Sequence, residues 1–337
     1  MIHKTRVAVR TILPGFLIAV LVSVGAIALQ KTELFTHAIP LSPLIIAILI
    51  GFAIRNSLTL PGRTHAGIKF SSKKVLRLAI IFLGFRLSFA EIAGIGMHAL
   101  VVIVIASTAT ILFTVWLGGR MGIPTKRSLL LGSGISICGA SAVAAVDGVI
   151  KAKEEDTAFA IGAITLLGTV FMVAYPFIYR FFGLHDTPYA IWSGASIHEV
   201  AQVTAAGSAM ADQTAQALAS SVKMIRVLFI IPFTFVLLFF PWHDADEKTA
   251  GKGKIAVPWF AVFFFVSVVI NSLGIIPANI TSAIVAVDTW GMTVAMAALG
   301  LDISVKSMMS IGKNAFILGV VSSLLIAVLS AVLVWAV

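Results

Sequence analysis

Long apolar runs separated by short polar gaps constrain this chain more than any motif does. A helix needs about 20 mostly apolar residues to cross a bilayer, and runs of that length recur throughout the 337 residues. Only 11% of the residues are charged and 59% are hydrophobic, whereas about a quarter of an average soluble domain is charged. The sequence therefore predicts an integral membrane protein and excludes a water-soluble globule.

Eleven apolar runs predict an all-α polytopic membrane protein that forms one transporter domain over residues 1–337. The predicted membrane-spanning helices are 11–29, 40–58, 75–92, 97–119, 127–149, 157–182, 188–207, 214–241, 256–276, 280–304 and 312–336. The first run follows three basic residues, as the core of a signal peptide would. It is longer than the usual apolar length of about 7–15 residues, so we expect it to be retained as a helix.

The basic residues predict which side of the membrane each loop faces, because cytoplasmic loops are rich in Lys and Arg. With a cytoplasmic N-terminus and eleven alternating helices, eighteen basic residues fall on the inner side. Three fall on the outer side, at Lys31, Lys151 and Lys153. This arrangement puts the C-terminus in the periplasm and the protein in a bacterial inner membrane. The isoelectric point of about 10.0 is thus a topology signal, and we expect no nucleic-acid partner.

An internal repeat is visible in two collinear matches. The segment 83–89 matches the segment 299–305, and the Asn-Ser-Leu triplet at 56–58 recurs at 271–273. We predict two repeat copies, at about 40–119 and 256–336. Because the copies lie seven predicted helices apart, an odd number, they run in opposite directions. Inverted repeats of this kind are typical of secondary transporters, although the remaining helices do not divide simply into five plus five.

Two predicted helices look interrupted by glycine and small hydroxylated residues. The run 127–149 contains Gly139-Ala140-Ser141, and the run 188–207 contains the similar Gly194-Ala195-Ser196. Such segments are either close-packed helix interfaces or discontinuous helices whose free N–H groups face an anion. The second interpretation predicts substrate-binding residues at Ser136, Cys138, Gly139, Ser141, Ser193, Ser196, Gln202 and Arg226.

Charged residues inside membrane helices are costly and are functional candidates by default. Glu199 is the leading candidate for proton coupling, with His198 in a relay and Asp302 as a further coupling residue. We expect Arg226 either to bind an anion or to neutralise Glu199. The alternative to a coupling role for Glu199 is a structural ion pair between Glu199 and Arg226. For Lys223 we expect a side chain that snorkels toward the outer interface, and Asp302 has the same interfacial alternative.

Three segments together resemble a known family. Cys138-Gly139-Ala140-Ser141-Ala142, the run 198–203 and Leu299-Gly300-Leu301-Asp302 are similar to the YeiH-type bacterial membrane proteins, a family labelled as sulfate exporters. The resemblance covers nearly the whole chain. It implies a transporter of many helices that is related to the bile-acid, arsenite and auxin carriers, with two crossed broken helices. The sulfate label is a hint about the substrate.

Two classes of function follow from these observations. The first is a secondary transporter of a small anion, such as sulfate or a sulfonate, coupled to protons or sodium. The second is a membrane-embedded enzyme that uses His198, Glu199 and Cys138. The inverted repeat favours the transporter, and a channel is disfavoured because rings of charge are absent. The segment His198-Glu199-Val200-Ala201-Gln202 lacks the second histidine of a zinc site. We therefore expect no catalytic residue, metal or cofactor. The expected partners are the lipid bilayer, the anion and the coupling proton or sodium ion, and the sequence does not decide whether the protein forms a homodimer.

Overall fold

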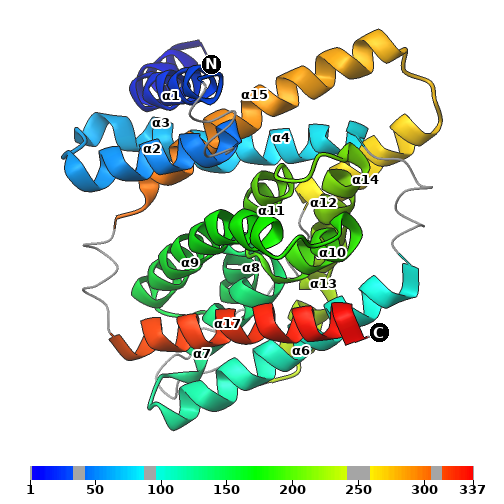
Figure 1. The fold of residues 1–337 in the computed structure, drawn as a ribbon. Helices are drawn as coiled ribbons and strands as arrows, with labels where there is room; N and C mark the ends of the chain where they lie inside the picture. Colours follow the sequence, from blue (N-terminus) through cyan, green and yellow to red (C-terminus); the bar gives the residue numbers. More distant parts are fainter. Residues whose placement is uncertain (1, 33–41, 87–95, 241–258, 305–312, 337) are drawn as a thin grey trace. The chain divides into compact units, whose positions relative to one another are not determined.

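The computed structural model describes residues 2–32, 42–86, 96–240, 259–304 and 313–336, and all regular structure in these ranges is helical. Contacts divide the chain into two units (Figure 1). Unit 1 comprises residues 1–89 and 262–306, and unit 2 comprises residues 90–261 and 307–337. Each unit thus combines an early and a late part of the sequence.

Unit 1 is built from one N-terminal helix and the first helices of both predicted repeat copies. Its helices are α1 (Ile2–Gln30), α2 (Pro43–Ser57), α3 (His65–Phe70), α4 (Leu76–Leu83), α14 (Trp259–Ser272) and α15 (Ala278–Asp302). A π-helical turn joins α3 to α4. Ser42 begins α2 by accepting the backbone N–H of Ile45, and Pro43 occupies the first helical turn, where its missing N–H costs nothing.

Glycines set two close helix crossings in unit 1, and the two crossings match each other. A Cβ at Gly300 would lie 2.2 Å from the carbonyl oxygen of Ile48 and 2.7 Å from the nitrogen of Phe52, on α2. A Cβ at Gly84 would lie 2.5 Å from the carbonyl oxygen of Phe264 and 3.3 Å from the nitrogen of Val268, on α14. Each of the three positions in one crossing is separated from its counterpart in the other crossing by the same number of residues. This separation is also that of the repeat match between 83–89 and 299–305. These contacts require glycine, because any side chain would strike backbone.

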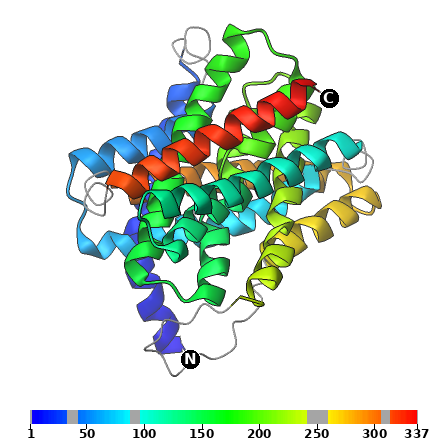
Figure 2. The same cartoon turned by 90° about the horizontal axis from the view of Figure 1, so that it is seen from below.

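Unit 2 contains the remaining helices. They are α6 (Gly96–Arg120), α7 (Thr125–Ser133), α8 (Ala140–Ile150), α9 (Glu154–Phe181), α10 (Asp186–Ser196), α11 (Val200–Gly207), α12 (Gln213–Leu228), α13 (Ile230–Leu237) and α17 (Lys313–Ala336). Helices α6 and α17 run side by side (Figures 1 and 2). They are joined by a 2.8 Å hydrogen bond from Thr114 to Ser322. Three acidic residues lie in the first turn of α9. The positive end of the helix dipole stabilises their negative charges there.

Many predicted helix positions agree with the observed ones, whereas the predicted count of eleven spans is not confirmed. Among the described residues, six helices are long and apolar enough to cross a membrane: Thr11–Gln30, Gly96–Arg120, Glu154–Phe181, Gln213–Leu237, Asn279–Asp302 and Lys313–Ala336. The shorter helix α2 and the segment Val262–Ser272 of α14 are also apolar. Several predicted ends, at 40–41, 87–92, 241, 256–258 and 312, lie outside the described residues.

The run predicted as a span at 127–149 is interrupted, as one of its two interpretations expected, and it is not one straight helix. One straight helix of this length would have ends roughly 35 Å apart, at about 1.5 Å per residue. Instead, Lys126 Nζ at the start of α7 donates to the carbonyl of Lys151, just after α8, at 3.3 Å. Arg127 near the start of α7 also pairs with Asp156 in the first turn of α9. Helices α7 and α8, with the π-helical turn Gly134–Cys138 between them, therefore double back, and we call residues 125–150 hairpin 1.

The run predicted at 188–207 also doubles back. Tyr189, near the start of α10, donates from its hydroxyl to the carbonyl of Ala206, near the end of α11, at 3.1 Å. Helix α10 ends at Ser196 and α11 begins at Val200. We call residues 186–207 hairpin 2. Ser196, Glu199 and Gln202 consequently do not lie on one continuous helix.

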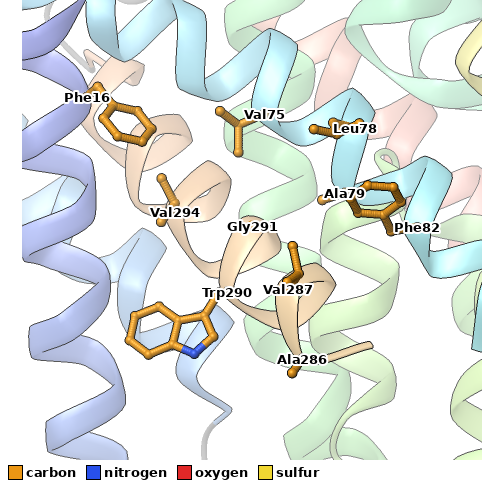
Figure 3. Close-up of a pocket in the computed structure, with 10 residues that line it drawn as sticks. All are labelled: Phe16, Val75, Leu78, Ala79, Phe82, Ala286, Val287, Trp290, Gly291 and Val294. Atoms are coloured by element: carbon orange, nitrogen blue, oxygen red, sulfur yellow. The ribbon is translucent and has the colours of Figure 1, made fainter. Parts of the chain in front are cut away.

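Unit 1 contains an apolar recess. It has a volume of about 380 Å³ and lies among α1, α4 and α15 (Figure 3). Phe16, Phe82 and Trp290 contribute its aromatic walls, and aliphatic side chains supply the rest. This lining offers almost no donors to an anion, so the recess does not fit the predicted substrate.

Candidate functional site

Two fully buried cations lie where the breaks of the two hairpins meet. Lys223 and Arg226, one turn apart on α12, are both 0% exposed. Lys223 Nζ donates to the carbonyl of Ile137 in hairpin 1 at 2.9 Å and to that of Ile197 in hairpin 2 at 2.7 Å. Because burial removes both charges from water, each cation requires close polar partners. The expectation that Lys223 snorkels to an interface is wrong.

Arg226 makes the same connection with more donors. Its Nε donates to the carbonyl of Ser136 at 2.5 Å, and its Nη2 donates to that of Ile135. Its Nη1 lies within hydrogen-bond distance of three carbonyls of hairpin 2, those of Gly194, Ala195 and Ile197. These carbonyls end the first helix of each hairpin, where the helix dipole is negative. Arg226 and Lys223 thus neutralise two helix C-termini at once.

Glu199 occupies the opposite kind of helix end. It is the N-cap of α11, where its carboxylate accepts the backbone N–H three residues on and its own N–H donates to Gln202 Oε1 at 3.0 Å. The same carboxylate lies beside Gly139 and the backbone N–H of Ala140, the first residue of α8, which stabilises its negative charge. It also accepts the hydroxyl of Thr165 at 3.1 Å. One carboxylate therefore caps the N-termini of both second half-helices, where the dipole is positive.

Gly139 makes room for this carboxylate. Its φ of +69° and ψ of −133° fall in a region that favours glycine. A Cβ there would lie 2.5 Å from Glu199 Cγ and 3.0 Å from Oε1. Gly168 on α9 has a similar role toward Gln202, since its Cβ would lie 2.1 Å from Gln202 Oε1. Gln202 also donates to the carbonyl of Thr165 at 3.1 Å, which ties hairpin 2 to α9.

Two serines outside the hairpins hold their breaks. Ser107 on α6 donates to the carbonyl of Ser136 in hairpin 1 at 2.9 Å. Ser323 on α17 lies 2.8 Å from His198 Nε2 in hairpin 2. Ser107 and Ser323 are separated by the same sequence offset that relates the two glycine crossings of unit 1. Neither serine was predicted, although this repeat offset was the signal that could have found them.

A small aromatic cluster supports hairpin 2. Tyr175 of α9 stacks on Trp192 of α10 with ring centroids 4.0 Å apart. The Tyr175 hydroxyl and Ser196 Oγ are 2.7 Å apart. Trp192 Nε1 donates to the carbonyl of Ala327 on α17 at 2.8 Å. These contacts fix the end of α10 and so the position of the break that follows it.

Most of the predicted substrate and coupling residues lie in these two hairpins. Hairpin 1 carries Ser136, Cys138, Gly139 and Ser141, and hairpin 2 carries Ser193, Ser196, His198, Glu199 and Gln202. All are buried except Ser141, which is half-buried. Asp302 is an exposed residue at the end of α15 in unit 1. Arg226 is at the predicted centre, but these described side chains do not form the predicted Glu199–Arg226 ion pair, since the guanidinium contacts carbonyls.

Metal ligands do not cluster in the part of the chain that the structure describes, where no group of three or more His, Cys, Asp or Glu side chains could hold an ion. Cys138 is a buried free thiol. What the site does offer is two buried cations and one buried carboxylate. Its excess of positive charge and its two N-terminal helix ends fit an anion.

Comparison with known proteins identifies the family. Residues 14–319 match the protein family described as "Conserved hypothetical protein 698". A UPF0324 membrane protein of Bacteroides thetaiotaomicron is 37% identical over 314 residues, which cover 91% of this chain and 93% of the relative. One from Bacillus cereus is 37% identical over 87% and 86% of the two chains. The Escherichia coli UPF0324 inner membrane protein YeiH is 34% identical over 83% and 81%. The expected YeiH-type resemblance is confirmed, and the chain belongs to the UPF0324 family of membrane proteins.

Proposed function

We propose that this UPF0324 protein is a secondary transporter that moves a small anion across a bacterial inner membrane, coupled to protons or sodium. The observation that carries the proposal is the charge of the buried site. Lys223 and Arg226 outnumber the single carboxylate of Glu199 at the point where two helix breaks meet. Unpaired buried charge is costly, so the site favours an anion that supplies the missing negative charge. Location in an inner membrane is supported by the name of the Escherichia coli relative.

An inverted repeat supports a transporter in particular, and the contacts suggest how the copies are arranged. Hairpin 1 contains Ser133-Gly134-Ile135-Ser136-Ile137, and hairpin 2 contains the similar Ser193-Gly194-Ala195-Ser196-Ile197. This match differs from the predicted one, since it aligns Gly134, not Gly139, with Gly194. We infer that the hairpins are equivalent elements of the two copies.

The second copy is then circularly permuted. The first copy runs in chain order through α2, α4, α6, hairpin 1 and α9. The second runs through α14, α15 and α17 and continues with hairpin 2 and α12, which precede α14 in the chain. The glycine crossings of unit 1 and the serines at 107 and 323 support this pairing. Permutation explains why a five-plus-five division was not visible in sequence order.

The hairpins change the inferred membrane topology. If each hairpin enters and leaves on one side, hairpin 1 opens to the cytoplasm and hairpin 2 to the periplasm, with the termini as predicted. Lys151 and Lys153 move to the inner side and Arg180 to the outer side. Nineteen basic residues then lie inside and two outside, which satisfies the positive-inside rule better than eleven spans do. The hairpins thereby acquire opposite orientations, as an inverted repeat requires.

Labelling of single cysteines tests this topology. Lys153 and His185 are exposed residues that follow α8 and α9. In intact cells, a membrane-impermeant maleimide should label His185→Cys and leave Lys153→Cys unlabelled, while permeabilised cells should label both. The native thiol at Cys138 is buried, and the unmodified protein measures its background. Eleven alternating spans require the reverse labelling pattern, which would reject the re-entrant hairpins.

Flux into proteoliposomes tests the function itself. We expect the purified protein to accelerate uptake of labelled sulfate or a sulfonate, and an imposed pH or sodium gradient to drive that uptake. The backbone N–H groups at two half-helix N-termini suit an oxyanion, as in other discontinuous-helix transporters. Liposomes without protein and liposomes with an Arg226→Met variant are the controls. Uptake of these anions no faster than in protein-free liposomes, with or without either gradient, would reject the proposal.

A further inference from the structure

We propose that the carboxylate of Glu199 occupies the anion-binding position itself, so that a substrate anion and a proton must arrive together. This inference rests on the proposed function and specifies its coupling and its substrate class. The carboxylate lies at the N-terminus of α8, against Gly139 and beside the N–H of Ala140, and it caps the N-terminus of α11, its own helix. These are the N–H groups that a bound anion would use. The protein thus carries its own substitute for the anion, tethered to hairpin 2.

The surroundings of Glu199 support the inference that its side chain can leave the N-termini of α8 and α11. Glu199 lies against α8 in the space left by Gly139, where a Cβ would collide with it. In the match between the two hairpins, the position equivalent to Glu199 is Gly139 itself. The site therefore has two similar helix ends and a single side chain that fills the space between them. Glu199 retains 6% exposure, whereas the two cations have none, so Glu199 is the least buried of the three charged residues.

Charge arithmetic specifies the substrate class. With Glu199 ionised and both Lys223 and Arg226 protonated, the buried cluster of these three residues carries one net positive charge. When Glu199 takes up a proton and its side chain withdraws, two positive charges remain on the cations. A doubly charged oxyanion then restores neutrality, whereas a singly charged one leaves an excess charge buried. The favoured substrate is a divalent tetrahedral oxyanion that binds with one proton.

The other titratable groups near Glu199 are few. His198 lies beside it in hairpin 2, and Cys138 lies in the break of hairpin 1. Helix α12 contributes Lys223 and Arg226, and α9 contributes Tyr175, which bonds Ser196. Lys223 and Arg226 are tied to backbone carbonyls, and the Nε2 of His198 is held by Ser323. Glu199 is the acid in this group whose release would vacate helix N-termini.

Calorimetric titration of the purified full-length protein with sodium sulfate tests the coupling. Titrations at one pH in two buffers of different ionisation enthalpy report the protons taken up on binding. We expect the protein to take up about one proton for each sulfate that binds. Above the pKa of Glu199, the affinity for sulfate should fall up to roughly tenfold per pH unit. Monovalent methanesulfonate should bind more weakly than sulfate. Glu199→Gln should bind sulfate without proton uptake and without pH dependence. Glu155→Gln, an exposed acid on α9, should behave as the unmodified protein does.

The outcomes separate this inference from the proposed function. Sulfate binding without proton uptake, or loss of sulfate binding in a folded Glu199→Gln protein, overturns the coupling role and leaves an anion transporter. Failure of the unmodified protein to bind either anion at any pH rejects both. Should Glu199→Gln not fold, Glu199→Asp provides the test. Its shorter side chain should cap α8 poorly, so sulfate should bind more tightly at high pH while proton uptake persists; unchanged affinity overturns the inference.

Discussion

Replacing Arg226 with methionine is expected to abolish anion flux and to lower the thermal stability of the protein severely. Methionine matches much of the length of arginine but removes the donors to carbonyls of both hairpins, among them those of Ile135 and Ala195. A buried polar group without a partner costs about 1–3 kcal/mol. With several carbonyls affected, we expect the Tm in detergent to fall by on the order of 10 °C. A fluorescence melt of the purified protein and a proteoliposome flux assay measure the two effects.

Two further variants separate the charge of Arg226 from its geometry. Arg226→Lys keeps the charge but cannot reach carbonyls of both hairpins with a planar fork. We expect it to recover part of the Tm and little of the flux. Arg180→Met, at an exposed site near the end of α9, is the matched control and should change neither. Unaltered Tm in Arg226→Met would mean that the guanidinium does not hold the hairpins together.

The sequence was informative about where helices lie because hydrophobic length is a local property. The described bounds of α6 and α17 lie within one residue of the predicted runs. Hydropathy could not distinguish a span from a hairpin, since two half-length helices of hairpin 1 contain as many apolar residues as one full-length helix. The distinction depends on contacts such as that of Lys126 with Lys151, which are distant in sequence.

The sequence pointed to the two helix breaks but not to the contacts that join them. Glycine and serine in the breaks pointed to both hairpins, and the glycine at 139 has the positive φ that makes a sharp break possible. The expectation that Arg226 pairs with Glu199 assumed that buried opposite charges meet directly. In the structure, backbone ends intervene: the cations neutralise helix C-termini and the carboxylate caps helix N-termini. Composition gives no indication of such dipole partners, because every residue type carries the same backbone groups.

Replacing Gly139 with alanine is the smallest change expected to disable the site. The backbone at φ +69° and ψ −133° strains any side chain, at a cost of about 1–3 kcal/mol. In addition, the new methyl group would push the Glu199 carboxylate away from the N-terminus of α8, because its position lies 2.5 Å from Glu199 Cγ. We expect flux to fall at least tenfold while the protein still folds and inserts. Initial rates in proteoliposomes, compared at equal protein content, measure the loss.

Gly148, also on α8, offers the matched control, because a Cβ there meets no atom within 4 Å. Gly148→Ala should keep full flux and gain up to about 1 kcal/mol of helix stability. A double variant, Gly139→Ala with Glu199→Ala, isolates the collision from the backbone strain. Removing the Glu199 side chain should restore part of the Tm lost in Gly139→Ala, since the two side chains would otherwise overlap. Additive losses of Tm in the double variant would show that the two residues do not interact. The close approach of Glu199 to Gly139 could not then explain why position 139 requires glycine.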